Sequence, residues 1–490
     1  MTLSDGTAAS RRILLIIAML TALRFVAGAV LPLSADEAYY WLWSKHLAAG
    51  YYDHPPAIAF LIRAGTAILG DTSPGVRLVP LLLSTAASWL VWRAGAIVLA
   101  DEGAGALACL LFNLTLMIAV ETMAATPDAP LIACAAGFLF ALAKLDETED
   151  GRWWLAVGAA GGVALLSKYS GFFLGLGALA WLVFVPRARH WLRSPWPCLG
   201  ALVALALFAP NLWWNATHGW MTFAFQFGRI GAGHFTLRFL AEFLAAQLVL
   251  ATPFVFVCMV LGVMPAARSP DAAALLAASV FPAIAYFALH SLHDRVQGNW
   301  PCFLYPALAV AAAGAMRRTA WHGWIAGPAD WSRRLAIPTA VLSLAVCYAQ
   351  AFFDVVPVGR QDPVSRLLAF GFADVARQVD GAGAVTHAAA ILTTDYGSTA
   401  WLAFHAHLPV VQIDEDDRWL AAPRADAGLL GRSLLYVVPR ERDRRDLILA
   451  HFATVAALKP IDRMRGGVAV ARYDVYRVGG LRGAALGRLP

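Results

Sequence analysis

The sequence predicts a mainly α-helical protein that crosses a membrane many times and ends in a small α/β domain. The chain has 490 residues, of which 60% are hydrophobic and 14% charged, and its mean hydropathy is +0.62. A soluble globular domain carries about 25% charged residues, so lipid is expected to surround most of this chain. About eleven apolar segments approach the roughly 20 residues that a helix needs to cross a bilayer. From about Gln361 the pattern changes to short strands alternating with helices.

The apolar segments predict a transmembrane domain over residues 1–354. The first segment follows a short polar head that contains Arg11 and Arg12. It lacks the short apolar core and the small-residue cleavage site of a signal peptide, so we expect an uncleaved helix. The candidate spans are residues 12–33, 76–99, 103–120, 129–145, 153–167, 170–186, 196–214, 237–264, 272–290, 300–316 and 335–353.

Basic loops predict the orientation of these spans. If Arg11 and Arg12 are cytoplasmic, alternation also puts the Arg-rich connections at 187–193 and 317–334 in the cytoplasm, in agreement with the positive-inside rule. The opposite, outer face then receives loops rich in acidic residues, histidine and aromatic residues, namely 34–75, 121–128, 168–169, 215–236, 291–299 and the chain after about residue 354. The sequence therefore predicts one polar site on the outer face.

The first outer loop, residues 35–70, is predicted to hold interfacial helices instead of a span. Residues 36–48 combine aromatic and polar side chains at helical spacing, which is typical of a helix in the membrane interface. Pro55 and Pro56 end that helix, and the apolar stretch 57–69 is short for a crossing. The aromatic stripe Tyr39, Tyr40, Trp41 and Trp43 fits an interfacial belt better than a sugar-stacking platform, although both remain open.

Residues 355–490 are predicted to form a soluble α/β domain on the outer face. Their expected strands are 385–394, 410–414, 434–438 and 469–478, and the expected helices include 364–379 and 444–452. Strands that alternate with helices are typical of α/β domains.

Several classes of function are disfavoured by composition. No basic run is interleaved with polar sequence, so we expect no nucleic-acid partner. The six cysteines lie in or beside apolar segments and form no C-x-x-C pair, which disfavours a disulfide framework or a zinc site. A transporter or flippase would carry charges near the bilayer midplane and matching halves, and this chain has neither pattern.

The motifs resemble those of the bacterial protein-mannosyltransferase-like superfamily, glycosyltransferase family 39 and relatives, which includes lipid A aminoarabinose and galacturonic acid transferases. The matching residues extend over the first 300 positions: Asp36-Glu37-Ala-Tyr-Tyr-Trp, Tyr51-Tyr-Asp53-His54-Pro55-Pro56, Arg77-Leu, Thr126-Pro127-Asp128, Ser167-Lys168-Tyr169, Pro210-Asn-Leu-Trp-Trp-Asn and Arg295-Val-Gln-Gly-Asn299-Trp300-Pro301. One departure concerns the donor: aminoarabinose transferases carry Glu-Lys before the two prolines, where this chain has Asp53-His54.

The resemblance implies a GT-C glycosyltransferase fold and a donor sugar carried on a polyprenyl phosphate. Together with the orientation predicted from the basic loops, it implies a transferase in the bacterial inner membrane, with a cytoplasmic N-terminus, a periplasmic site and a lipid or glycolipid acceptor of the lipid A type. A protein O-mannosyltransferase with a polypeptide acceptor is the alternative enzyme. No cofactor is assigned, and a divalent metal is left open; Asp53, His54 and His293 could be drawn as its ligands, but their spacing does not demand one.

Asp36, Glu37 and Asp128 are the candidate catalytic residues. Asp36 would act as a general base or orient the acceptor hydroxyl, the role that the resemblance gives to the Asp of the first outer loop. The alternative is a helix cap, since Ser34 or Asp36 could open the helix. Glu37 is expected to support Asp36. Asp128 follows Thr-Pro at the start of a span, which also suits a cap.

The candidate donor-binding residues are His54, Asp53, Lys168, Arg295 and His293. Fixed cations can stabilise the charge of a leaving phosphate. Lys168 would do so, or would extend its amine to the interface. Arg295 would do so, or would pair with Asp294. His54 would contact either the phosphate or the sugar.

Overall fold

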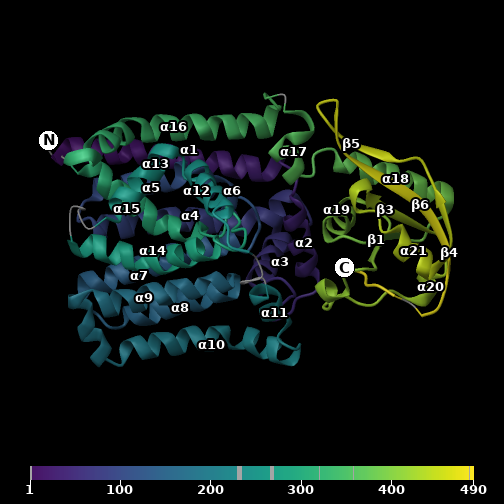
Figure 1. Ribbon diagram of the computed structural model, residues 1–490, viewed down its shortest axis with the longest axis horizontal. Helices are drawn as coiled ribbons and strands as arrows, with labels where there is room; N and C mark the ends of the chain where they lie inside the picture. The colour runs from purple at the N-terminus through teal and green to yellow at the C-terminus, as the bar shows by residue number, and fades with distance from the viewer. Residues whose placement is uncertain (1–2, 229–233, 265–269, 319–320, 357, 485) are drawn as a thin grey trace. The chain divides into compact units, whose positions relative to one another are not determined.

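The computed structural model describes residues 3–228, 234–264, 270–318, 321–356, 358–484 and 486–490 (Figure 1). The chain divides into two compact units. Unit 1 comprises Met1–Gly28, His54–Ile58 and Arg77–Tyr348, and unit 2 comprises Ala29–Asp53, Ala59–Val76 and Ala349–Pro490. Most of the first outer loop therefore groups with the C-terminal residues, whereas the sequence predicted a boundary near residue 354.

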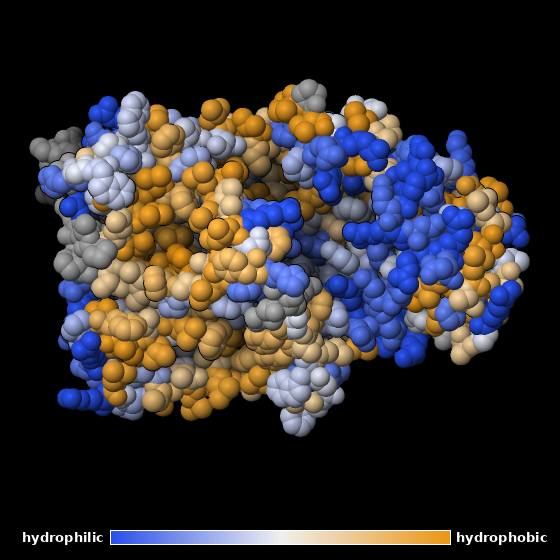
Figure 2. Space-filling view, in the orientation of Figure 1, coloured by the Kyte–Doolittle hydropathy of each residue, from blue (hydrophilic) through white to orange (hydrophobic). Residues whose placement is uncertain are grey.

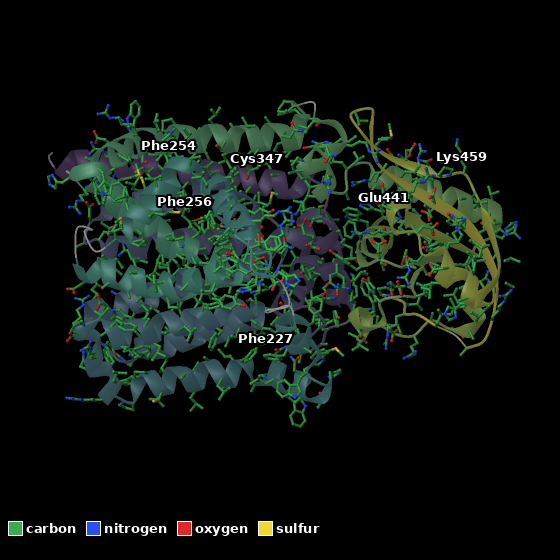
Figure 3. The ribbon with its side chains drawn as sticks, in the orientation of Figure 1. Phe227, Phe254, Phe256, Cys347, Glu441 and Lys459 are labelled. Carbon is green, nitrogen blue, oxygen red and sulfur yellow. The ribbon has the colours of Figure 1, made fainter. Side chains whose placement is uncertain are left out.

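Every regular element of unit 1 among the described residues is a helix, and residues 29–30, 73–76 and 349–353, at the ends of three of these helices, are assigned to unit 2. The α-helices of unit 1 are α1 (Leu3–Val30), α4 (Ser73–Val98), α5 (Glu102–Leu114), α6 (Leu116–Glu121), α7 (Asp128–Thr148), α8 (Trp153–Ser167), α9 (Phe172–Phe184), α10 (Trp196–Thr217), α11 (Met221–Phe227), α12 (Arg238–Leu250), α13 (Pro253–Gly262), α14 (Pro270–His290), α15 (Tyr305–Arg317) and α16 (Ala326–Phe353). Short 3-10 turns include η1 (Tyr169–Gly171), η2 (Pro186–Arg193), η3 (Cys302–Leu304) and η4 (Gly323–Ile325). All six cysteines lie on these helical segments as free thiols, Cys347 on α16 among them (Figure 3).

Small residues let α8 and α10 pack backbone against backbone. A Cβ added at Gly158 of α8 would overlap the carbonyl group of Gly200 on α10, and one at Gly162 would crowd the backbone of Ala204. Close approach through small residues is the usual way for helices to associate in lipid, where no hydrophobic effect drives them together.

The outer surface of unit 1 is suited to lipid. Large apolar side chains are exposed on α1, α10 and α16, for example Met19 at 63%, Trp213 at 74% and Leu342 at 64%. In the space-filling view, hydrophobic residues cover most of the visible surface of the helical part, whereas hydrophilic residues cover much of the visible surface of the sheet-containing part (Figure 2). Among the described residues, six helices are long and apolar enough to cross a membrane, or up to eight if two bent pairs each form one span.

All the apolar segments predicted as spans contain helix, so the expected mainly helical fold is confirmed, while the count of about eleven crossings stays a prediction. The predicted span 103–120 is interrupted at Thr115, between α5 and α6, and the predicted span 237–264 is not continuous either. The latter breaks into α12 and α13, which meet at 104°. Thr252 has a φ of +66°, and Pro253 supplies no amide hydrogen to continue the first helix.

Unit 2 contains α2 (Ala35–Lys45), α3 (Ala57–Leu69, whose first two residues belong to unit 1) and a mixed sheet. Within the described residues the sheet has six strands: β1 (Ile391–Thr393), β2 (Val410–Gln412), β3 (Leu434–Pro439), β4 (Phe452–Ala457), β5 (Ile461–Arg465) and β6 (Val468–Leu481). Their order is β2-β1-β3-β6-β4, with β5 also paired to β6. β1 runs parallel to β2 and β3, while β6 is antiparallel to its three partners.

The remaining helices of unit 2 are α17 (Pro363–Leu367), α18 (Phe372–Thr386), α19 (Tyr396–His405), α20 (Ala427–Leu430) and α21 (Arg445–His451), with 3-10 turns η5 (Gly359–Gln361), η6 (Asp416–Trp419) and η7 (Arg440–Arg442). The expected α/β domain is therefore present. The predicted strand 385–394 is shorter in the structure because α18 continues to Thr386. The sequence did not predict β4 and β5.

The order of the strands creates a switch point at β1. The chain leaves β1 through α19 to reach β2 on one side, and then returns to β3 on the other side. The connections that follow two adjacent parallel strands leave in opposite directions at such a point. Ligands commonly bind there, outside the carboxyl ends of the strands. Tyr396 follows β1 and Arg418 follows β2. Glu441, which Figure 3 labels, follows β3.

Candidate active site

Ser34 caps the helix that carries the first acidic pair. Its hydroxyl accepts a hydrogen bond from the backbone amide of Glu37 at 3.2 Å, and Glu37 Oε2 accepts one from the backbone amide of Ser34 at 2.8 Å. This reciprocal capping box satisfies two backbone donors at the start of α2. Because Glu37 is fully buried in it, its carboxylate is used in building the helix start, and Asp36 is not the cap.

Asp36 keeps an exposed side chain at the same helix start. The hydroxyl of Tyr396, the first residue of α19, donates to its Oδ1 at 3.1 Å. Although the carboxylate is exposed, dense surrounding atoms remove part of its hydration and raise the pKa of Asp36. The Tyr396 hydrogen bond and Arg418 lower this pKa, whereas the carboxylates of Asp53 and Glu37 raise it further. An accessible carboxylate of raised pKa has the properties of a general base.

Asp53, in contrast, is buried and held by two donors. Its Oδ2 accepts a hydrogen bond from the Tyr39 hydroxyl at 2.7 Å and lies 2.5 Å from Arg418 Nη1. Arg418 also contacts Glu415, with 3.3 Å between Nε and Oε1. The guanidinium lies over the rings of Tyr396, Tyr52 and Tyr39, at 4.9, 5.4 and 5.9 Å from their centroids. Such cation–π contacts strengthen when the cation is partly desolvated.

The aromatic stripe of α2 is buried within protein. Tyr39, Tyr40, Trp41 and Trp43 have exposures of 8% or less. Tyr39 packs against Tyr396 and Trp419, with ring centroids 5.2 and 5.0 Å apart, and Trp41 packs edge-on against Phe404. Trp43 stacks on Tyr51. These rings attach α2 to residues from the C-terminal part of unit 2. This packing role differs from both predicted roles, the interfacial belt and the sugar-stacking platform.

Asp128 and Lys168 form a second polar cluster, in unit 1. Lys168 Nζ lies 2.7 and 3.0 Å from the two carboxylate oxygens of Asp128. Asn299 Nδ2 donates to the same carboxylate at 2.9 Å, and Cys302 Sγ lies 3.1 Å from it. Asp128 is 3% exposed and begins α7 without a side-chain capping bond. The structure thus joins two predicted site residues directly and adds Asn299 from the motif at 295–301.

Arg295 is largely exposed and pairs with an acid that the motifs do not include. Its Nε lies 3.2 Å from Glu242 Oε2, with 74% of the arginine side chain exposed, so the predicted alternative partner Asp294 is not the one observed. Arg238 binds the other oxygen of Glu242 at 2.8 Å. His293 is exposed near the ring of Phe235, and His54 is half-buried in unit 1.

No group of three or more His, Cys, Asp or Glu side chains suited to a metal occurs among the described residues. Asp53, His54 and His293 therefore do not form such a cluster. Tyr396 and Arg418 were not predicted from the sequence. The signal that could have found them is weak, because a Tyr and an Arg that follow short strands are unremarkable without the topology of the sheet.

Comparisons with known proteins agree with the motifs. A profile of the family described as dolichyl-phosphate-mannose-protein mannosyltransferase matches residues 53–214. The lipid A galacturonosyltransferase RgtD of Rhizobium johnstonii is 29% identical over 285 residues, which are 56% of this chain and 59% of that protein. The lipopolysaccharide core galacturonosyltransferase RgtA of the same organism is 30% identical over 207 residues, 41% of each chain. The chain thus spans about half the length of these curated relatives.

Solved structures share the fold over nearly the whole chain. ArnT from Cupriavidus metallidurans bound to undecaprenyl phosphate matches with a TM-score of 0.61 and 17% identity, covering 96% of this chain and 98% of that one. Its apo structure gives 0.62 and 18% at the same coverage. The Archaeoglobus fulgidus oligosaccharyltransferase tethered to an acceptor peptide gives 0.53 and 11%, covering 94% of this chain and 75% of that one.

Fold and motifs together define a membrane protein with the GT-C glycosyltransferase fold, as the sequence predicted. Within that class, the predicted resemblance to the protein-mannosyltransferase-like superfamily and its lipid A-modifying members is confirmed.

Proposed function

We propose that this protein is a glycosyltransferase that moves a sugar from a polyprenyl-phosphate carrier to lipid A or a related glycolipid. The observation that carries this proposal is the state of Asp36: an exposed carboxylate, released from the cap by Ser34 and oriented by Tyr396, within a GT-C fold. The names of the two curated relatives favour galacturonic acid as the sugar and a lipopolysaccharide-type acceptor.

The chemistry needs a base near the acceptor. The acceptor hydroxyl oxygen attacks the anomeric carbon of the donor, and the bond between that carbon and the phosphate oxygen breaks. Asp36 accepts the hydroxyl proton, and the polyprenyl phosphate leaves with the bonding electrons. A raised pKa makes the Asp36 carboxylate a stronger base.

The leaving phosphate requires cations, and we assign them from the motifs and the local charges. Arg295 is suited because its planar guanidinium is 74% exposed, with Glu242 as its ion-pair partner at 3.2 Å. Lys168 remains a donor-site residue in this proposal, with Asp128 fixing the position of its ammonium group. His54 and His293 are the further candidates for phosphate or sugar contacts. Asp53 orients the loop between α2 and α3 through its ion pair with Arg418.

The decisive experiment follows a radiolabelled polyprenyl-phosphate sugar in membranes that contain the protein. Label in the glycolipid fraction supports the proposal. Label in protein instead would support the second candidate, a protein O-mannosyltransferase, which the name of the matching family profile favours. The labelled galacturonic acid and mannose donors are compared in parallel, because the sugar is part of the proposal.

The same assay tests Asp36. General bases contribute about 100-fold to 10,000-fold to a rate, so Asp36→Asn is expected to lose about 100-fold or more of turnover. Its thermal unfolding should be unchanged, because the capping box of Ser34 and Glu37 stays intact. Near-full activity in a folded Asp36→Asn protein would remove the base from this mechanism.

A further inference from the structure

We propose that Tyr396 and Arg418, both from the C-terminal part of unit 2, are positioning residues for two carboxylates, with Tyr396 orienting Asp36 and Arg418 holding Asp53. This inference rests on the proposed function, because it assumes that Asp36 is the base. It gives residues 349–490 a part in the reaction that neither the motifs nor the relatives' names assign.

The start of α2 is fixed to this C-terminal part by several contacts. Trp401 Nε1 of α19 donates to the carbonyl of Leu33 at 3.2 Å, and the amide of Ala369 donates to the same carbonyl at 3.0 Å. Ser34, the helix cap, also forms a β-bridge with Leu368. These bonds surround the residues just before Asp36, so the position of its carboxylate depends on the C-terminal part.

Tyr396 is itself held in place. Asp395 caps α19 by accepting a hydrogen bond from the amide of Ser398 at 3.0 Å, which fixes Tyr396 as the first residue of the helix. Its ring packs against Tyr39 and under the guanidinium of Arg418. Burial raises the pKa of Tyr396, so its hydroxyl keeps its proton and donates to Asp36.

The charges around Asp36 explain why both residues are needed. Glu37 and Tyr40 of α2, Asp53 of the following loop, Tyr396 of α19 and Arg418 of η6 all influence its environment. Three carboxylates in this small region disfavour one another's ionised forms. Tyr396 stabilises the ionised form of Asp36 by donating a hydrogen bond, and Arg418 does so by its charge, so losing either should leave Asp36 protonated at a higher pH.

The topology of the sheet accounts for how the two residues meet. Tyr396 directly follows the β1 segment, Arg418 follows β2, and the two strands are parallel neighbours at the switch point. Their carboxyl ends point to the same edge of the sheet, where functional groups commonly gather in open α/β folds. In this chain that edge carries the hydrogen-bond donors for Asp36 and Asp53.

The test is the pH dependence of turnover with saturating donor. Because the base must be ionised, activity falls as pH drops through the pKa of Asp36. This fall is the acid limb of the pH profile. Tyr396→Phe should move this acid limb upward by about one pH unit, which is about tenfold lower turnover on the acid side. Turnover well above the limb should be near that of the unmodified protein, and the KM values for donor and acceptor should change little.

Arg418 provides an independent pair of variants. Arg418→Gln removes the positive charge and should move the acid limb in the same direction, while Arg418→Lys keeps the charge and should restore most of it. The matched controls lie in the same unit: Tyr476→Phe removes a hydroxyl that donates to Asp443 at 2.9 Å, and Arg472→Gln removes a partner of Asp462 at 2.6 Å. Both controls should keep the original pH profile.

The outcomes separate this inference from the proposed function. If Asp36→Asn is inactive but Tyr396→Phe and Arg418→Gln keep the original acid limb, the positioning role is wrong and the base assignment survives. The positioning role is also wrong if these two variants lose activity equally at every pH, because a merely structural role gives that result. If folded Asp36→Asn remains active, Asp36 is not the base, and both the proposed mechanism and the positioning role are wrong. Should Tyr396→Phe not fold, the Arg418 variants decide.

Discussion

Two neighbouring acids at one helix start have different fates because only one of them can close the capping box. Glu37 lies three residues after Ser34 and so reaches back to the cap, whereas Asp36 lies two residues after it and points elsewhere. The difference leaves Asp36 exposed for chemistry and buries Glu37 completely. The motif Asp-Glu thus combines one carboxylate suited to chemistry with one that builds the helix start.

At the residue scale, the Asp128–Lys168 pair yields a prediction about charge compensation. Both side chains are largely buried, so Lys168→Met alone leaves an uncompensated carboxylate and should destabilise the protein by roughly 3–5 kcal/mol. The double variant Asp128→Leu with Lys168→Met should recover most of that stability. Thermal unfolding in detergent measures the effect.

The activity of that double variant then distinguishes a structural from a functional pair. We expect it to be folded and inactive, because Lys168 is assigned to the donor phosphate and Asp128 to its orientation. A folded double variant with normal turnover would show that the pair serves stability alone.

Arg295 allows a sharper test of donor binding. Arg295→Ala should raise the apparent KM for the polyprenyl-phosphate donor and lower kcat, with a much smaller change in acceptor KM. Arg295→Lys should rescue only partly, because a point charge cannot reproduce a bidentate phosphate contact. Arg238→Ala is the matched control, since Arg238 pairs with the same Glu242 but has no assigned role. An effect confined to acceptor KM would move Arg295 to the acceptor side.

At the element scale, the contact between α8 and α10 depends on particular glycines. Gly158→Ala should lower the unfolding temperature, because the new Cβ would overlap the carbonyl of Gly200 and force the two backbones apart. Gly161→Ala, three residues along the same helix, would meet Phe138 only at an ordinary 3.6 Å. It should be neutral or slightly stabilising, because alanine costs less entropy than glycine in a helix. Equal unfolding temperatures would argue against close backbone packing.

Elements with a local signal could be predicted from the sequence, and those set by distant contacts could not. The helix expected at 36–48 is found as Ala35–Lys45, because its spacing and cap are local features. The break at Thr252–Pro253 was overlooked because hydropathy alone continues across it. Tyr396 is 360 residues from Asp36, so no pattern within a window could relate the two. β4, with four of its six residues exposed, lacks the buried run that is typical of a central strand.

At the scale of the whole molecule, the orientation predicted from the basic loops remains to be measured. Cysteine accessibility can test it in a Cys198→Ala background, because Cys198 is the exposed native thiol among the described cysteines. His407→Cys reports on the C-terminal part, since that side chain is 92% exposed, and Arg193→Cys reports on a predicted cytoplasmic loop. Neither residue belongs to the proposed site.

We expect a membrane-impermeant maleimide to label His407→Cys in cells whose outer membrane alone is permeable. Arg193→Cys should react only after the inner membrane is opened, because the positive-inside rule keeps its arginine-rich loop in the cytoplasm. The reverse pattern would put the C-terminal part in the cytoplasm. Because Tyr396 and Arg418 come from that part and hold Asp36 and Asp53, such a result would move the proposed chemistry to the cytoplasmic face as well. The labelling experiment therefore tests the compartment of the reaction along with the topology.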